Sequence, residues 1–328
     1  MSTATDVEVR AMQAEDRDAV IVLLSATQSW VPSELFDRFF SWKHLESPFG
    51  ASPAWVATVG GRVVGFRTFV RWEFEHPDGR VRRAVRAVDT ATHPEYQGRG
   101  IFRRLTMQSL DELRTDGVDF VFNTPNDKSR PGYLKMGWRE VGRLPAAVRP
   151  KSAGAVVRML RSRVPAERWS LVSTGGDAAV DVLSDSGTAA LLASLAPAAA
   201  LRTRRTVDYL RWRYSFEPLT YRALALDDDT ERGVAVFRVR RRGTATEAAL
   251  CEVLVPSADI AAAHTLERAV GNATDADYVI RLGGSSATSK FLRLPGQGPM
   301  LTWRDVSGSQ TPPGIDDWQL QLGDVELF

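Results

Sequence analysis

The stretch AVRAVDTATHPEYQGRGIFRRL, residues 84–105, decides the fold. Its first half is typical of a strand, and the strand ends at Pro94 because proline lacks the N–H that a sheet requires. A tight turn with two glycines follows, and helical spacing begins directly after it. Four apolar side chains then share one stripe at about 100° per residue: Phe102, Leu105, Leu110 and Leu113. The stretch therefore predicts a strand, a glycine turn and a helix in direct succession.

The glycine turn predicts an anion site. In a strand–turn–helix unit, several backbone N–H groups and the positive end of the helix face one concavity. Gly98 and Gly100 let the backbone approach a ligand because they carry no Cβ, and Arg99 adds a mobile cation. The concavity suits a pyrophosphate. On its own, however, a two-glycine turn is also typical of an ordinary connection between a strand and a helix.

The segments before this stretch predict strands and helices that complete one domain. Residues 7–12 alternate as a strand, residues 19–24 give a helix its apolar side chains, and residues 34–42 form a second helix. Residues 54–59 and 63–74 predict a hairpin. Six side chains of its second strand share one face: Val64, Phe66, Thr68, Val70, Trp72 and Phe74.

Two motifs in this half resemble those of a known superfamily. Gln97-Gly98-Arg99-Gly100 is similar to the Q/R-x-x-G-x-G/A coenzyme A loop of GNAT acyltransferases. The N-x-x-A/S-x-x-x-Y-x-x-x-G-F signature of that superfamily resembles a later set: Asn126, Ser129, Tyr133, Gly137 and Trp138. The resemblance covers about Val7 to Gly142 and departs from the pattern at Phe102, where the family usually has glycine or alanine.

The second half looks like a diverged copy of the first. Trp42-Lys43-His44 recurs as Trp212-Arg213-Tyr214, Pro94 as Pro256, and Tyr133 as Phe291, whereas QGRGIF has no counterpart. The resemblance implies an α/β fold of the α+β type, with two tandem GNAT-like domains. Each would hold a mixed, mostly antiparallel sheet flanked by helices. We expect a catalytic domain at residues 1–148, a linker carrying a helix at 149–168, and a degenerate GNAT-like domain at 169–328.

The resemblance implies an N-acetyltransferase that uses acetyl-CoA and in which an acceptor amine attacks the thioester directly. In this superfamily the donor lies between two strands that splay apart, here residues 90–92 and 120–123. An N–H near Thr92 would polarise the thioester carbonyl. Tyr133 matches the tyrosine that donates a proton to the departing thiolate, with packing of a short helix as its alternative role. Asn126 either bonds coenzyme A or caps that helix.

The resemblance implies the following coenzyme A contacts: Thr90, Ala91, Thr92, Gln97, Gly98, Arg99, Gly100, Ile101, Phe102, Asn126 and Tyr133.

Several groups are candidates for the general base. Asp89 lies in the middle of the fourth strand, where a carboxylate is uncommon unless it is paired or functional, and Arg67 and Arg86 are possible partners. His44, together with Trp42, comes from a region that borders the acceptor pocket in this superfamily. The C-terminal carboxylate of Phe328 is a further candidate, by resemblance to GNAT proteins of the enhanced-intracellular-survival type. Water is the remaining alternative.

Composition limits the other classes of function. A length of 328 residues suggests about two domains, and a formal net charge of +2 does not favour a nucleic-acid partner. The single cysteine, Cys251, allows no internal disulfide or cysteine metal cluster and lies in an apolar stretch that predicts a core position. We expect no metal and no membrane partner, since no apolar run approaches the roughly 20 residues that span a bilayer. A cytoplasmic location is the default expectation.

Two alternative functions remain open at this point. The tandem arrangement also resembles aminoacyl-tRNA-dependent peptidyltransferases, although these need no pyrophosphate loop. The protein could instead be a non-catalytic acyl-CoA sensor. For an enzyme, the acceptor would be a small-molecule or peptide amine, because no motif defines the variable loops of the acceptor pocket. The sequence leaves the acceptor and the oligomeric state open.

Overall fold

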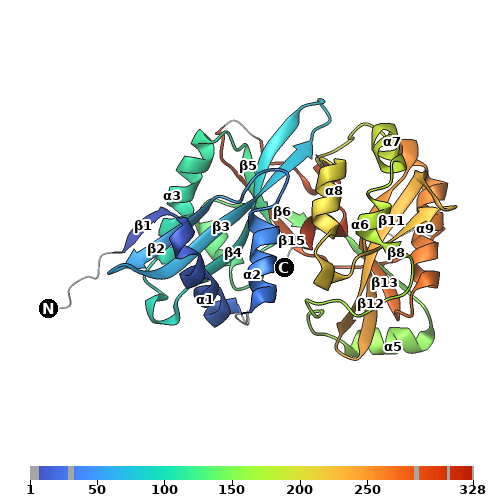
Figure 1. Ribbon diagram of the computed structural model, residues 1–328, viewed down its shortest axis with the longest axis horizontal. Helices are drawn as coiled ribbons and strands as arrows, with labels where there is room; N and C mark the ends of the chain where they lie inside the picture. The colour runs from blue at the N-terminus through green and yellow to red at the C-terminus, as the bar shows by residue number, and fades with distance from the viewer. Residues whose placement is uncertain (1–6, 29–32, 284–287, 309–310, 327–328) are drawn as a thin grey trace. The chain divides into compact units, whose positions relative to one another are not determined.

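The computed structural model describes residues 7–28, 33–283, 288–308 and 311–326. These residues form two compact units, each built on its own sheet (Figure 1). The units are discontinuous. The first comprises Met1–Phe74, Val81–Gly142 and Met300–Gly314, and the second comprises Glu75–Arg80, Arg143–Pro299 and Ile315–Phe328.

The unit boundaries differ from the predicted domain boundaries. β7 (Ala146–Pro150) belongs to the second sheet, although it begins before the predicted boundary at residue 148. β15 (Met300–Asp305) comes from the far end of the chain, yet it pairs with β5 (Phe120–Asn123) in the first sheet. Sequence patterns predict strands but not their partners, so neither assignment could be read from the order of the elements. The predicted linker does contain a helix, α5 (Ala153–Arg161).

The first sheet has the strand order β1-β2-β3-β4-β5-β15-β6 along its main path. β4 and β5 are parallel, whereas β1 with β2, β2 with β3, and β5 with β15 are antiparallel. The mixed, mostly antiparallel sheet flanked by helices is therefore confirmed. The remaining strands are β1 (Glu8–Ala11), β2 (Ala54–Val59), β3 (Arg62–Glu75), β4 (Val81–Thr92) and β6 (Arg139–Arg143). The helices are η1 (Ala14–Asp16), α1 (Arg17–Gln28), α2 (Glu34–His44), η2 (Pro94–Tyr96), α3 (Ile101–Thr115) and α4 (Arg130–Lys135).

Helices cover both faces of this sheet. On one face, α3 lies so close to β3 that a Cβ on Gly65 would be 2.7 Å from a methyl carbon of Ile101. On the other face, the ring of Phe66 lies 6.4 Å from that of Phe40 in α2. Successive β3 side chains thus point to opposite layers, as strand geometry requires. The two layers enclose the middle of β4.

The second sheet has the order β14-β7-β13-β12-β11-β10-β8. Its strands besides β7 are β8 (Asp177–Ala178), β10 (Arg222–Leu226), β11 (Asp229–Arg242), β12 (Ala245–Leu254), β13 (Tyr278–Leu282) and β14 (Leu292–Leu294). The other elements of the unit, besides α5, are α6 (Ala179–Val182), α7 (Gly187–Ser194), β9 (Arg202–Thr203), α8 (Val207–Tyr214), η3 (Glu217–Leu219), η4 (Pro256–Ala258), α9 (Ile260–Ala273), η5 (Ile315–Asp317) and α10 (Leu322–Val325). As predicted, Cys251 is buried in this unit.

The two units differ at the connection that follows their long central strands. In the first unit η2 begins at Pro94 and α3 begins only at Ile101. In the second unit η4 begins at Pro256, and α9 follows at Ile260 without an equivalent of the glycine turn. This agrees with the expectation that QGRGIF has no counterpart there. Only the first unit has the long glycine connection.

Buried ion pairs join residues 324–326 to the rest of the second unit. The Glu326 carboxylate accepts from Arg238 Nη2 at 2.7 Å and also pairs with Arg240. Arg205 pairs with Glu252 at 2.8 Å and with Asp324 at 3.1 Å. Burial alone would raise the pKa of Glu326, but the arginine charges outweigh it and lower this pKa to about 2. The carboxylate therefore stays ionised inside the protein.

We predict that Glu326→Gln lowers the free energy of unfolding by about 3–5 kcal/mol near neutral pH, because it leaves buried arginines without their counter-charge. A carboxylate whose pKa is lowered by folding contributes fully above its ordinary pKa of 4.5. Its contribution fades as the pH falls toward about 2. In urea unfolding, the free energies of unfolding of the variant and the wild type should thus approach each other as the pH falls. Glu231→Gln, on the exposed start of β11, is the control. A constant difference between pH 7 and pH 3 would contradict the prediction.

Candidate functional site

The glycine turn is an open, exposed connection at the start of α3. Gly98 and Gly100 adopt φ angles of 76° and 75°, a left-handed conformation that costs other residues strain. Apart from the glycine and its two neighbours in the chain, no atom of the described residues lies within 4 Å of the position that a Cβ would take at Gly98 or Gly100. Gly100 is the N-cap of α3, so the first N–H groups of the helix lack intrahelical acceptors. The turn thus presents free backbone donors beside open space.

Cations surround this turn. Arg99 is exposed and lies over the ring of Tyr96, with 4.9 Å from its guanidinium carbon to the ring centroid. Arg103 and Arg104 are exposed in the first turn of α3, which carries no acidic residue. The Gln97 side chain donates to the carbonyl of Thr92 at 3.3 Å and so ties the turn to the end of β4. The local charge and the free amides both favour an anionic ligand.

β4 and β5 diverge close to this turn. Their parallel register covers Ala84 to Arg86 opposite Phe120 to Phe122, and among the described residues no further pair follows. Beyond this register β4 is no longer buried throughout: residues 84–87 are buried, residues 88–90 are partly exposed when the backbone is counted, and Ala91 is buried again. Phe120 to Phe122 pair with residues 84–86 of β4, and residues 90–92 lie beyond this register. The gap between residues 90–92 and 120–123 stays a prediction.

Asp89 lies where the two strands part. Its φ is 41°, an unusual value for a residue other than glycine and one that interrupts the regular course of β4. Its Oδ2 accepts from Lys43 Nζ at 2.7 Å and contacts His44 Nε2 at 2.9 Å. His44 Nδ1 lies 3.1 Å from Ser52 Oγ, so both ring nitrogens have partners. The last turn of α2 therefore holds the strand in this conformation.

The Asp89 carboxylate is buried and charged. Its side chain is 5% exposed, and that of Lys43 is fully buried. Burial raises the pKa of Asp89, but Lys43 and His44 outweigh this effect and hold the pKa well below its ordinary value. Burial lowers the pKa of His44 despite its contact with Asp89. Asp89 is thus a weak proton acceptor, and these contacts favour a structural role over that of general base.

The predicted partners of Asp89 were wrong. Arg86 donates to Thr124 Oγ1 at 3.3 Å, and Arg67 points to the opposite face of the sheet. Lys43, which was not predicted, supplies the charge instead. One sequence signal could have pointed to Lys43 and His44: the pattern Trp-Lys/Arg-His/Tyr recurs in both halves. In the second unit Tyr214, the counterpart of His44, likewise contacts a buried acid, donating to Glu252 at 3.0 Å.

Tyr133 lies on the α3 face. Its side chain is 5% exposed, and its oxygen accepts a hydrogen bond of 2.7 Å from Arg67 Nη1. The same nitrogen donates to Thr90 Oγ1. Arg67 is fully buried, and its Nε and Nη2 have no hydrogen-bond partner among the described residues. A buried arginine with two unused donors is costly in a protein core, which makes this position a strong candidate for function.

β4 therefore separates two chemical environments. Asp89 points to α2, where it meets Lys43 and His44, while its neighbour Thr90 points to Arg67 and Tyr133. A group lying between the separated strands would have the histidine and carboxylate on one side and the phenol on the other. A transfer reaction that must remove one proton and supply another requires such an arrangement.

The structure also places the other predicted residues. Phe102 packs edge-on against Tyr133, with ring centroids 5.4 Å apart. Asn126 Oδ1 accepts from the backbone N–H of Ser129 at 2.9 Å, so its side chain caps the approach to α4. Trp42 is 3% exposed and stacks on Phe39, which indicates packing in α2 rather than contact with an acceptor. Phe328 lies outside the described residues.

Among the described residues, no group of three or more histidine, cysteine, aspartate or glutamate side chains is arranged to hold a metal ion. None of the described helices has both the length and the apolar character needed to cross a membrane.

Solved structures share this fold along most of the chain. One is a GCN5-related N-acetyltransferase from Kribbella flavida, with 15% identity, a TM-score of 0.62, and coverage of 92% of this chain and 72% of that one. Another is Eis1 from Mycobacterium abscessus, with 16% identity, a TM-score of 0.56, and coverage of 92% and 74%. A third, from Enterococcus faecalis V583, is described as a probable N-acyltransferase and has 12% identity, a TM-score of 0.62, and coverage of 92% and 73%.

At these identities the likeness concerns the fold alone. A comparison with curated protein sequences gave no match. A family model described as an acetyltransferase (GNAT) domain matches residues 8–141, the part that holds the glycine turn, the separated strands and Tyr133. Residues 8–141 of this chain are thus similar to a GNAT acetyltransferase domain.

Proposed function

We propose that the first unit transfers an acetyl group from acetyl-CoA to a primary amine. The observation that carries this proposal is the glycine turn, whose free amides and open glycines lie at the end of β4, near the point where β4 and β5 part. Residues 97–102 would hold the pyrophosphate, and Arg99 would add a cation. When bound, acetyl-CoA supplies an acyl group that the acceptor amine attacks directly, without a covalent enzyme intermediate.

Thr92 would assist at the acyl group. It is the last residue of β4, directly beyond the separated part of the strand. A backbone N–H here would donate to the carbonyl oxygen, and this hydrogen bond strengthens as negative charge develops on that oxygen. Thr90 and Ala91 would line the same gap.

Tyr133 would protonate the departing thiolate. A guanidinium has only donors, so the Tyr133 oxygen must accept the hydrogen bond from Arg67, and the phenol proton is left to point elsewhere. Arg67 thus orients the phenol without competing for its proton, and we propose it as a positioning residue. Phe102 supports the ring from the α3 side. In the second unit the corresponding residue is Phe291, which cannot donate.

The amine would lose its proton on the α2 side, where His44 and Asp89 lie. We propose water as the immediate acceptor, because Asp89 is held by Lys43 and both nitrogens of His44 have partners. That Asp89 acts as the catalytic base stays a prediction, and its contacts with Lys43 and His44 argue against it. The acceptor is proposed as a small-molecule or peptide amine.

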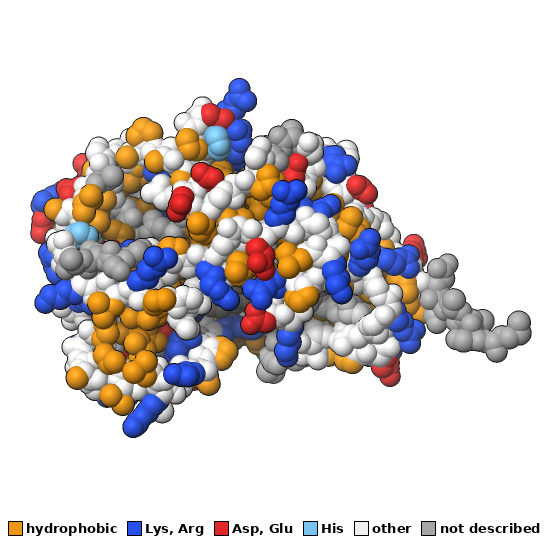
Figure 2. Space-filling model, turned by 180° about the vertical axis from the view of Figure 1, so that it is seen from behind, with side chains coloured by type: hydrophobic (Ala, Val, Ile, Leu, Met, Phe, Trp, Pro, Cys, Tyr) orange, Lys and Arg blue, Asp and Glu red, His pale blue; other side chains and the backbone are white. Residues whose placement is uncertain are grey.

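Two other functions have less support. An aminoacyl-tRNA-dependent peptidyltransferase would need a surface for tRNA, yet on the face drawn in Figure 2 lysine and arginine side chains are interspersed with acidic ones. An acyl-CoA sensor would not need an oriented phenol at the acyl site. We further propose that the second unit is a degenerate copy that supports the first.

We predict that Gly100→Glu weakens acetyl-CoA binding about a hundredfold or more, because it places an anion where the pyrophosphate would lie. Isothermal titration calorimetry measures this directly. The matched control is Gly79→Glu, since Gly79 also has a positive φ of 80° and open space around its Cβ position. If both variants bind acetyl-CoA as the wild type does, the assignment of the turn is wrong.

We predict that Tyr133→Phe lowers kcat about a hundredfold or more while the affinity for acetyl-CoA stays unchanged. Arg67→Met should also lower kcat, and the double variant should be no slower than Tyr133→Phe alone, because Arg67 acts through the phenol. Steady-state kinetics with an amine panel provide the measurement. Additive losses in the double variant would show instead that Arg67 acts independently of Tyr133.

Asp89→Asn should lower the free energy of unfolding by about 3–5 kcal/mol, because it leaves the buried Lys43 ammonium without a counter-charge. Since folding lowers the pKa of Asp89, the difference from the wild type is full above the ordinary pKa of 3.8 and shrinks as the pH falls below it. Chemical unfolding at several pH values measures this loss. In the folded variant, kcat should fall less than about tenfold, and a much larger fall would identify Asp89 as the base.

A further inference from the structure

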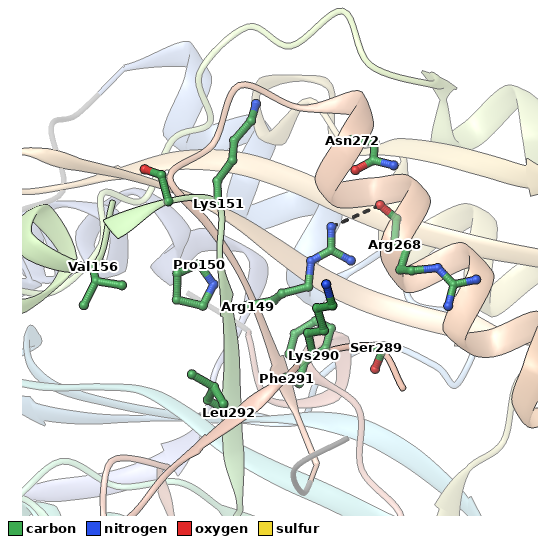
Figure 3. A pocket seen from close by; sticks show the side chains of 11 residues that line it. Arg149, Pro150, Lys151, Val156, Arg268, Asn272, Ser289, Lys290, Phe291 and Leu292 are labelled. Atoms are coloured by element: carbon green, nitrogen blue, oxygen red, sulfur yellow. Dashed lines mark hydrogen bonds between the residues drawn. The ribbon is translucent and has the colours of Figure 1, made fainter. Parts of the chain in front are cut away.

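The second unit contains a cavity of about 800 Å³ that the proposed reaction does not use. The end of β7, the start of α5, the last turns of α9 and residues 289–292 line it (Figure 3). All of these residues belong to the second unit. The cavity therefore lies within one compact body.

The polar side of this cavity is cationic. Arg149, Lys151, Arg268 and Lys290 line it, and no aspartate or glutamate is among the lining residues. Lys151 lies 3.7 Å from the exposed Asp275. Glu267, whose charge acts on Arg149, pairs with Arg281 at 3.2 Å. Burial and then the charge of Arg268 lower the pKa of Arg149, and this outweighs the charge of Glu267, which raises it. The lining residues themselves thus supply no carboxylate for these cations.

Arg149 is fixed in place by the backbone of α9. Its guanidinium donates to the carbonyls of Glu267 and Arg268 at 3.4 and 3.3 Å, and Figure 3 shows the second bond. A Cβ on Gly271 would lie 2.3 Å from Arg149 Nη2. Glycine inside a helix costs about 1 kcal/mol relative to alanine. Here its lack of a side chain gives the guanidinium its place against the helix.

The remainder of the cavity is apolar. Pro150, Val156, Phe291 and Leu292 line it beside the cations. Leu292 is 60% exposed, so the apolar side of the cavity is open to solvent. The cavity thus offers a cationic wall and an apolar wall to one ligand.

We propose that this cavity binds an organic phosphate, with the phosphate between Arg149, Arg268 and Lys290 and the apolar part of the ligand against Pro150 and Leu292. Guanidinium groups match the oxygen geometry of a phosphate, and several cations suit a dianion better than the single charge of a carboxylate. This site shares no residue with the glycine turn, which belongs to the other unit.

Calorimetric titration with phenyl phosphate tests this proposal in the full-length protein. Arg149→Met and Lys290→Met should each weaken binding about tenfold or more, because each removes a charge-assisted contact. The matched control is Arg293→Met, which also removes one positive charge. Arg293 follows Leu292 in β14 but is not among the residues that line the cavity. The cavity variants keep the glycine turn intact, so any phosphate bound there contributes equally to all of them. In Gly100→Glu that binding should be lost. A difference in affinity between the cavity variants and the wild type therefore reports on the cavity.

Two further ligands separate the contributions of charge and apolar contact. Inorganic phosphate should bind more weakly than phenyl phosphate, and benzoate should bind more weakly than both. Because Arg149 is packed against α9, Arg268→Met on the exposed face of the helix provides a second variant, with thermal unfolding as a check of the fold. Equal affinity in Arg149→Met, Arg268→Met and Arg293→Met would overturn the proposal, as would benzoate binding as tightly as phenyl phosphate.

Discussion

The contact of Asp89 with Lys43 and His44 is the interaction on which the candidate site depends. A residue with a positive φ in the middle of a strand is strained, and it persists only where its surroundings hold it. Here a buried ammonium and an imidazole from the last turn of α2 hold the carboxylate. The strand changes course at this point, just beyond the last pair between β4 and β5. An ion pair in the core thus accompanies the opening that the proposed donor would occupy.

The same strand brings the structural acid Asp89 and the surroundings of the proposed proton donor Tyr133 to opposite faces. Neighbouring residues of a strand point in opposite directions, so Asp89 meets α2 and Thr90 meets Arg67 and Tyr133. Gly65 lets α3 lie close to β3, which brings the glycine turn and Phe102 near this face. The positions of the candidate groups therefore follow from the ordinary packing of two helical layers on one sheet.

The second unit shows what this scaffold does without the glycine turn. Its long strand β12 also carries a buried acid, Glu252, which Tyr214 and Arg205 hold. Its helix α9 begins soon after η4, so the amides of its first turn do not follow a glycine concavity. Buried acids held by the preceding helix thus occur in both units, whereas the glycine turn occurs in one of them among the described residues. This favours a structural origin for the acid and a functional one for the turn.

The sequence by itself determined most strands of the first sheet, its mixed α/β character, the strand–turn–helix unit and the position of Tyr133. These features follow from local patterns, because periodicity, proline and glycine act over a few residues. Only the tertiary structure decided which strands pair, that β15 enters the first sheet and β7 the second, and that Lys43 rather than Arg67 neutralises Asp89. It also decided that Arg67 donates a hydrogen bond to Tyr133 and that the Arg149 guanidinium packs against Gly271. These contacts join residues far apart in the chain, and several side chains of the right charge could have made them. Only the packing of the layers brings one particular pair within reach.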